Sequence, residues 1–267
     1  MRRPAIPEEH HIMTTINRLL AISYGAVSYL LFLVAFLYAI GFVGNLWVPR
    51  SIDHAIAAPA GQAFAIDVIL LGLFAIQHSV MARPAFKRWW TRFVPQPIER
   101  STYVLLSNLV LFLLYWQWRT LPAVVWHVEL RPGRLALWVL FWVGWMIVFT
   151  GSFMISHFDL FGLRQVYAYW RGEPPSDIAF RTPLFYRLIR HPLMLGFIIA
   201  FWAAPTMTVG RLLFAASTTA YILIAVQLEE HDLAAALGTR YLDYRREVPM
   251  LVPRPHLRGA SRLRPGL

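Results

Sequence analysis

Apolar runs long enough to cross a lipid bilayer divide most of the chain. A transmembrane helix needs about 20 consecutive apolar residues. Runs that reach or approach this length cover 19–43, 61–81, 102–118, 135–155 and 212–228. Only 15% of the residues are charged, whereas soluble domains carry about 25%. The chain is therefore predicted to be an all-α integral membrane protein with about five to six transmembrane helices.

A sixth apolar stretch, between Pro192 and Pro205, is too short to cross a bilayer comfortably by itself. Pro192 is compatible with a helix start, since the first helical turn has no internal acceptor for its N–H groups. We therefore expect residues 192–228 to form a helical hairpin that turns near 205–211.

Basic residues alternate in number between the two sides of the apolar runs. The positive-inside rule places both termini and the basic loops 82–100 and 157–191 in the cytoplasm. The formal charge of +11 then reflects topology and contact with anionic membrane lipid, not nucleic acid. The terminal arginines that support this orientation are Arg2, Arg3, Arg240, Arg245, Arg246, Arg254, Arg258, Arg262 and Arg264.

The chain contains no cysteine, so it has neither disulfides nor thiolate metal ligands. We expect no metal site, and the sequence indicates no obligate protein partner. No internal repeat is visible. We therefore interpret residues 1–267 as one domain, with N-terminal transmembrane helices in 1–156 and a catalytic core in 157–267.

Two polar clusters lie at the predicted cytoplasmic ends of apolar runs, where polar groups are functional candidates because hydrocarbon makes them costly. Gln77, His78 and Ser79 end the second run. His157 and Asp159 follow the fourth run and suggest a base with a nearby carboxylate. The structural alternatives are an interface cap for the first cluster and an amphipathic interfacial segment for the second.

The two feet of the predicted hairpin carry opposite charges. Arg190 and His191 precede its first helix, and Glu229 and Glu230 lie at the end of its second. A tight turn brings the ends of antiparallel helices together, so these residues should meet on the cytoplasmic side. Such a site suits a zwitterionic aromatic cofactor, for example S-adenosylmethionine. The alternatives are positive-inside anchoring and a solvated helix end.

The order RHP, short helix, FW–P, second helix and EE–L–G–Y–Y–VP over about residues 178–253 resembles the core of the isoprenylcysteine carboxyl methyltransferases. The resemblance implies cofactor contacts through a tyrosine before the motif histidine, the motif itself and the glutamate. Together with their neighbours, the candidate cofactor residues are Gln165, Tyr186, Arg190, His191, Pro192, Leu193, Met194, Glu229, Glu230 and Tyr241.

Two departures from that pattern matter. Met194 replaces the tyrosine usual at the fourth motif position, which puts a hydroxyl contact there in doubt. Ala225 stands where the isoprenylcysteine enzymes carry a substrate-binding arginine, so the acceptor should not be a carboxylate.

The segments "QHSVMARPAFKRWW" and "HFDLFGLRQV" look like the bacterial membrane methanethiol S-methyltransferases. This resemblance implies S-adenosylmethionine-dependent methylation of a small thiol, methanethiol, to dimethyl sulfide. A small alkyl thiol is mostly protonated at neutral pH, so a general base is useful. His157, oriented by Asp159, is the first candidate, and His78 is the second.

Other functions stay open at this point. The acceptor could be an isoprenoid or a lipid amine or thiol. A membrane haem or redox-associated protein is a different class, although His78, His157 and His191 all fall near predicted cytoplasmic ends and not opposite one another within the spans. A transporter is a further alternative, but paired broken helices in repeated halves are not visible.

Overall fold

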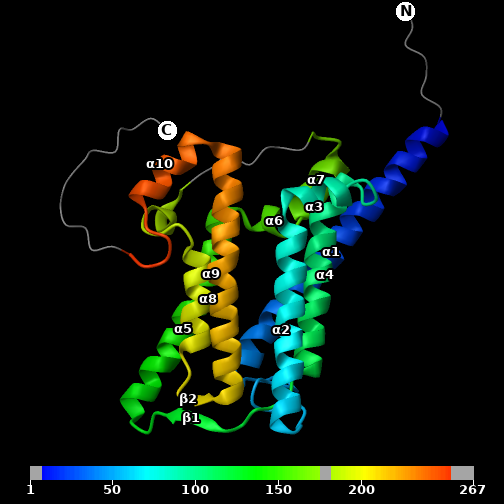
Figure 1. Cartoon of the computed structure of the whole chain (residues 1–267). Helices are drawn as coiled ribbons and strands as arrows, with labels where there is room; N and C mark the ends of the chain where they lie inside the picture. Colours follow the sequence, from blue (N-terminus) through cyan, green and yellow to red (C-terminus); the bar gives the residue numbers. More distant parts are fainter. Residues whose placement is uncertain (1–7, 175–181, 254–267) are drawn as a thin grey trace, which may run out of the picture.

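A computed structural model of the chain describes residues 8–174 and 182–253, with side chains from residue 15 onward. The arginines at positions 2, 3, 254, 258, 262 and 264 that support the predicted orientation lie outside the described residues. The described part is a bundle of long helices with short helices at one end and a small sheet at the other (Figure 1).

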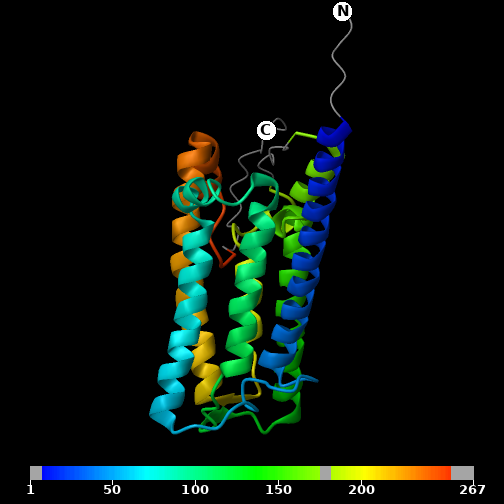
Figure 2. The same ribbon diagram turned by 90° about the vertical axis from the view of Figure 1, so that its right-hand side faces the viewer.

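Among the described residues, five helices are long and apolar enough to cross a membrane. Each contains one of the predicted runs, and the protein is an all-α integral membrane protein as predicted. Two views at right angles show these helices running side by side (Figures 1 and 2). They are α1 (Glu8–Gly44, apolar from Thr15), α2 (Ala60–Ala82), α4 (Gln96–Gln117), α5 (Arg131–Ile155) and α9 (Val209–Leu237).

The predicted helical hairpin is present. Its first arm is the short α8 (Pro192–Trp202) and its second arm is α9. The connection contains a strand, β2 (Thr206–Thr208), which pairs antiparallel with β1 (Val124–His127) between α4 and α5. This two-stranded sheet was not predicted, and it ties the hairpin turn to the loop that precedes α5.

The short α8 is supported by close packing against α5. A Cβ atom added at Gly144 of α5 would lie 2.7 Å from the carbonyl oxygen of Gly196 and from the amide nitrogen of Ala200 in α8. Small residues permit such close helix approach in membranes, where dispersion contacts replace the hydrophobic effect as the driving force. An arm too short to span a membrane is therefore held by its neighbour.

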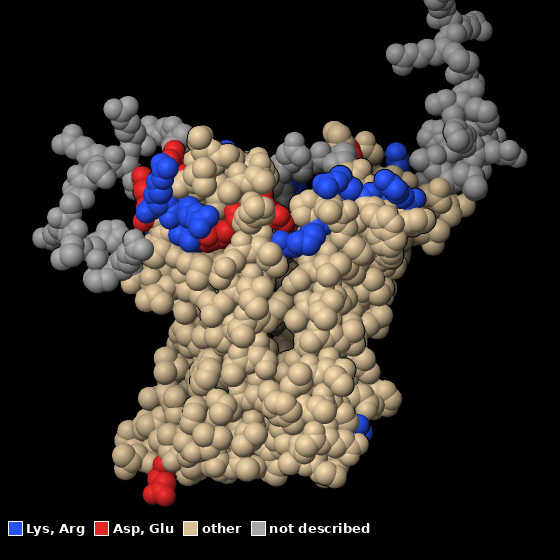
Figure 3. Space-filling view, viewed as in Figure 1, with Lys and Arg blue, Asp and Glu red and all other residues tan. Residues whose placement is uncertain are grey.

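Five short helices gather at the end of the bundle where α2, α5 and α9 finish (Figure 1): α3 (Pro84–Trp90), α6 (His157–Leu160), α7 (Leu163–Arg171), η1 (Leu184–Arg187) and α10 (Thr239–Glu247). In the face shown in Figure 3, charged side chains crowd this end and the middle band is almost free of them. We call it the charged end. An uncharged middle band is what a lipid-embedded surface requires.

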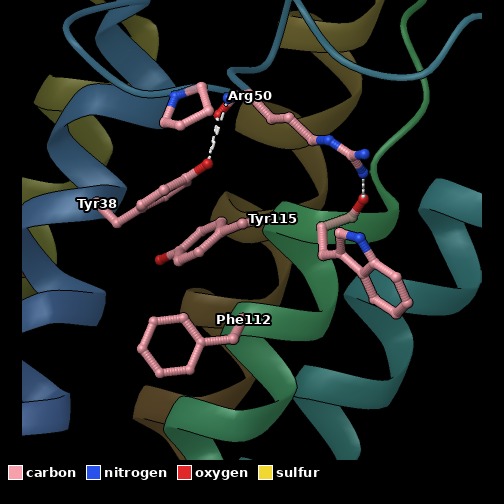
Figure 4. Close-up of a pocket in the computed structure, with 6 residues that line it drawn as sticks. Tyr38, Arg50, Phe112 and Tyr115 are labelled. Carbon is pink, nitrogen blue, oxygen red and sulfur yellow. Dashed lines mark hydrogen bonds between the residues drawn. The ribbon is translucent and has the colours of Figure 1, made fainter.

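The opposite end has a shallow pocket of about 290 Å³ (Figure 4). Tyr38 and Tyr115 stack in it with ring centroids 4.9 Å apart, and the Arg50 guanidinium donates to the Trp116 carbonyl. The pocket is lined by Tyr38, Pro49, Arg50, Phe112, Tyr115 and Trp116. None of the predicted site residues lies there.

Candidate active site

The two feet of the α8–α9 hairpin meet at the charged end, as predicted. Glu230 Oε1 accepts from Arg190 Nε at 2.7 Å and contacts His191 Nε2 at 3.0 Å. Arg245 of α10 approaches the other carboxylate oxygen at 3.4 Å. The Glu230 and Arg190 side chains are both buried to over nine-tenths. Because several positive or polar groups surround the buried carboxylate, its desolvation is compensated.

The segment after α10 completes this arrangement through its backbone. The amide of Arg190 donates to the Pro249 carbonyl at 2.9 Å, and that of His191 donates to the Met250 carbonyl at 3.1 Å. The Arg190 guanidinium also donates to the carbonyls of Arg245 and Val248. Arg190 and Glu230 are thus occupied within the protein, and their hydrogen bonds brace the site.

Glu229 lies beside this group but is much more accessible. Its side chain is 49% exposed, and a carboxylate oxygen lies 3.9 Å from His191 Nδ1. Its charge acts on the tyrosines Tyr103, Tyr186, Tyr221 and Tyr241. These residues come from α4, η1, α9 and α10, so Glu229 lies near the junction of several elements.

Three tyrosines, Tyr186, Tyr241 and Tyr244, lie near the charged residues of the hairpin feet. Tyr244 donates to the Tyr186 carbonyl at 2.5 Å. The Tyr186 hydroxyl is buried and has no hydrogen-bond partner among the described residues. Burial raises the pKa of Tyr186 and Tyr241 above the ordinary value, and that of Tyr244 to about 12. All three therefore stay neutral and can donate at physiological pH.

The start of α8 adds backbone donors. His191 occupies the N-cap position and Pro192 the first turn. The N–H groups of Leu193 and Met194 follow in that turn, where a helix offers no internal acceptor. These N–H groups lie at the positive end of the helix dipole, where a negatively charged group such as a carboxylate is favoured.

The predicted pairing of His157 with Asp159 is wrong. The His157 ring contacts the Tyr29 hydroxyl at 2.8 Å and Ser152 Oγ at 2.9 Å. Asp159 instead accepts from Arg164 at 2.8 Å and from Ser156 at 2.5 Å. Both residues lie on α6, and helix positions two apart do not face each other. His157 itself is buried, and burial lowers its pKa.

His157 lies in an aromatic environment. Its ring stacks on Phe153 with centroids 4.2 Å apart and planes 5° from parallel. We call His157 and its ring neighbours the aromatic cage: Tyr29, Phe32, Phe153, Phe158 and Phe161. The cage joins α1 to α5 and α6.

His78 has different neighbours. The Tyr103 hydroxyl lies 2.9 Å from its Nε2, and Ser107 Oγ lies 3.3 Å from its Nδ1. The neighbouring Ser79 contacts the Tyr221 hydroxyl of α9 at 3.5 Å. Tyr103 and Tyr221 were not predicted as site residues, although Tyr221 precedes Glu229 by two helical turns on one face.

Gln165 is placed on α7, which packs against α1 and α4. Its amide nitrogen donates to the Asp159 carbonyl at 3.3 Å, and its amide oxygen is buried without a partner among the described residues. The structure therefore groups Gln165 with α6 and α7, whereas the other predicted cofactor residues gather at the hairpin feet and α10.

Comparison with known proteins gives close relatives over nearly the whole chain. The chain is 66% identical over 240 residues to the methanethiol S-methyltransferase of Mycobacterium tuberculosis, covering 90% of this chain and 98% of the relative. It is 57% identical over 240 residues to methanethiol S-methyltransferase 2 of Bradyrhizobium diazoefficiens, covering 89% and 91%. It is also 33% identical over 195 residues to Nurim of Mus musculus, covering 70% and 72%. No family model and no solved structure matches the chain.

Proposed function

The chain belongs to the methanethiol S-methyltransferase family, and from this we propose that it transfers a methyl group from S-adenosylmethionine to methanethiol, releasing dimethyl sulfide. The observation that carries the proposal is the 66% identity over 90% of the chain to a protein of that name. The meeting of His191 and Glu229 at the hairpin feet supports it.

The residues at the hairpin feet fit the cofactor. The buried Tyr186 hydroxyl without a partner among the described residues and the half-exposed Glu229 carboxylate offer a donor and an acceptor. We propose that Glu229 binds the ribose or the amino group, and that His191 with the first turn of α8 binds the carboxylate. When bound, S-adenosylmethionine supplies a methyl group on a positively charged sulfur. Arg190, Glu230 and Tyr241 hold the shape of the site.

The chain's own contribution to the reaction is positioning and deprotonation. Holding two reactants in line replaces a bimolecular encounter and accounts for much of the catalysis in such transfers. A thiol must also lose its proton, because the thiolate is the nucleophile. Two histidines at the charged end are candidates to accept it, His157 and His78.

We further propose that the charged end faces the cytoplasm of a bacterial inner membrane and that the chain works as one domain. The distribution of arginine and lysine supports this orientation. Because the chain has no cysteine, single cysteines at 88, 171 and 125 can be labelled with an impermeant thiol reagent. Labelling from outside at 125 alone is expected; labelling at 88 or 171 with protection at 125 would reverse the orientation.

The function is tested directly with purified protein, methyl-labelled S-adenosylmethionine and a panel of thiols, fatty amines and prenylcysteines. Labelled dimethyl sulfide from methanethiol is the expected product. Label in a lipid amine or prenylcysteine, with none in dimethyl sulfide, would overturn the acceptor. An absorbance spectrum of the same sample with a haem band would favour the redox alternative.

A further inference from the structure

A polar and aromatic cluster lies between α2, α4 and α9. Its α9 residue, Tyr221, lies two helical turns before Glu229. Phe74 stacks on His78 with centroids 5.1 Å apart and meets Tyr221 edge-on at 6.2 Å. Figure 3 shows the surface hollowed between α2 and α9. We call this group the α2–α4–α9 cluster; it consists of Phe74, His78, Ser79, Tyr103, Ser107 and Tyr221.

One face of α9 connects the cluster to the proposed cofactor site. Tyr221, Ala225 and Glu229 are four residues apart in sequence, and helix residues with this spacing lie above one another on one face. Tyr221 contacts the cluster and Glu229 faces the hairpin feet. Ala225 lies between them in sequence on the same face and carries only a methyl side chain.

His78 is the more accessible of the two candidate bases. His157 is buried in the aromatic cage. The ring nitrogens of both histidines contact protein hydroxyls, so the two differ in exposure and not in hydrogen bonding. His78 is only partly buried, and its neighbours Phe74 and Ser79 on α2 contact Tyr221 of α9. A base must come within hydrogen-bond reach of the proton that it removes. His191 also approaches this face of α9, 3.9 Å from Glu229, but we assign it to the cofactor. Of the two candidate bases, His78 therefore belongs to the cluster that contacts Tyr221.

We propose that the acceptor thiol binds in the α2–α4–α9 cluster beside Ala225 and that His78 takes its proton. This inference rests on the proposed function. The S–H electron pair stays on sulfur, which becomes the thiolate, and the proton joins a ring nitrogen of His78, which becomes cationic. After the product leaves, His78 returns the proton to water. Tyr103 is a positioning residue that orients the imidazole.

Charged groups of both signs lie around the cluster. Arg100 of α4 acts on His78, and Arg83 and Arg100 both act on Tyr103. Arg83 is anchored to Asp232 of α9 at 2.8 Å. Glu229 is the opposing negative charge. The Tyr103 and Tyr221 hydroxyls add neutral donors from α4 and α9, and these donors can stabilise a thiolate directly.

The absence of cysteine allows the cluster to be tested without the cofactor. The variant Ala225→Cys places a thiol at the proposed acceptor position. Ile224→Cys is the matched control, because Ile224 is the neighbouring residue and is 60% exposed on the outer face. The rate of alkylation by a small neutral reagent, measured against pH in detergent, reports the pKa of each thiol.

We expect the thiol at 225 to ionise below the ordinary value of about 8.5, and the midpoint to rise by about one pH unit when His78→Gln is added. Tyr103→Phe, a milder change, should give a smaller rise and covers the case in which His78→Gln fails to fold. The thiol at 224 should respond to neither change. A midpoint at 225 that neither His78→Gln nor Tyr103→Phe alters would overturn the inference.

Methyl transfer in the same variants separates this inference from the proposed function. Incubation of Ala225→Cys with methyl-labelled S-adenosylmethionine, followed by mass spectrometry, should show one added methyl group on the thiol at 225 and none at 224. A His78-dependent pKa without methylation of any thiol, methanethiol included, would reject the proposed function and leave the polar cluster as described. If methanethiol is methylated but the thiol at 225 has an ordinary pKa that does not depend on His78, the proposed function stands and this inference is rejected.

Discussion

His78 and His157 lie near the same end of the bundle, yet their surroundings differ. The aromatic cage closes on His157, which stacks on Phe153 and contacts Tyr29 and Ser152. The α2–α4–α9 cluster leaves His78 partly exposed beside polar groups of three helices. The contacts of the aromatic cage connect α1 to α5 and α6. The contacts of the α2–α4–α9 cluster instead reach Tyr221 on α9, the helix that carries Glu229.

The two histidines show that an imidazole can act as a base only where a substrate can approach one of its ring nitrogens. A histidine enclosed by aromatic rings, with its polar atoms satisfied, is a packing element. Both ring nitrogens of His78 also contact hydroxyls, but its side chain is partly exposed, so a substrate can replace one of these contacts. We therefore assign thiol activation to His78 and the junction of α1, α5 and α6 to His157.

The largest effect should come from removing the proposed base. General-base catalysis contributes about 10²–10⁴-fold, so His78→Gln is expected to lower turnover of methanethiol by about that factor at neutral pH. Binding of S-adenosylmethionine, measured by equilibrium dialysis, should change little. A variant that folds and keeps near-normal turnover would end the distinction between the two histidines.

Filling the space beside Glu229 should have the next largest effect. A misplacement of about 1 Å can reduce a positioned reaction by about 10²-fold, so Ala225→Leu should lower kcat/KM for methanethiol by about that much. Cofactor affinity should be retained. The neighbouring Ile224→Leu is the control, because residue 224 lies on the exposed face. Equal losses in both variants would move the acceptor away from Ala225.

Glu229 should matter for the cofactor more than for the thiol. Losing one charge-assisted hydrogen bond costs about 1.5–3 kcal/mol, so Glu229→Gln should weaken S-adenosylmethionine binding roughly 10- to 100-fold. Glu173→Gln serves as control, since the side chain of Glu173 is 57% exposed and pairs with Arg171 on α7. Unchanged affinity in a folded Glu229→Gln protein would remove the assignment.

Replacing His157 should give the smallest change in turnover and a clear change in stability. His157→Phe keeps a ring in the aromatic cage but removes the hydrogen-bond partner of the Tyr29 hydroxyl, whereas Ser152 still donates to the Phe149 carbonyl. An unsatisfied buried group costs roughly 1–3 kcal/mol. Turnover should fall by less than about tenfold, well short of the factor expected from removing a general base. Thermal unfolding in detergent measures the loss of stability. A large loss of turnover in a variant that stays stable would contradict the assignment.

Acid should test the burial of His157. Burial lowers the pKa of His157 in the folded protein, so the unfolded chain binds its proton more readily, and stability rises with pH in that window. The contribution of neutral His157 to the free energy of unfolding is complete above about pH 6.5. It is lost as pH falls toward the pKa of His157 in the folded protein. His157→Phe should therefore be less sensitive to acid than the wild type as pH falls below about 6.5.

Sequence patterns predicted the membrane helices and the meeting of the hairpin feet because run length, proline position and charge act locally. They did not predict the β1–β2 pairing, which joins segments far apart in the chain. They also paired His157 with Asp159 by proximity in sequence, although α6 is helical and points them apart. The cluster of His78, Tyr103 and Tyr221 depends on packing among three helices, which no single run encodes.

The most direct test of the account is the pH–rate profile of methyl transfer to methanethiol for wild type, His78→Gln and His157→Phe, measured side by side at saturating S-adenosylmethionine. The account predicts that the defect of His78→Gln shrinks as pH rises, because more of the thiol is then already ionised, and that His157→Phe keeps the wild-type profile. A defect in His78→Gln that is constant with pH, or a pH-dependent rescue seen in His157→Phe instead, would contradict it.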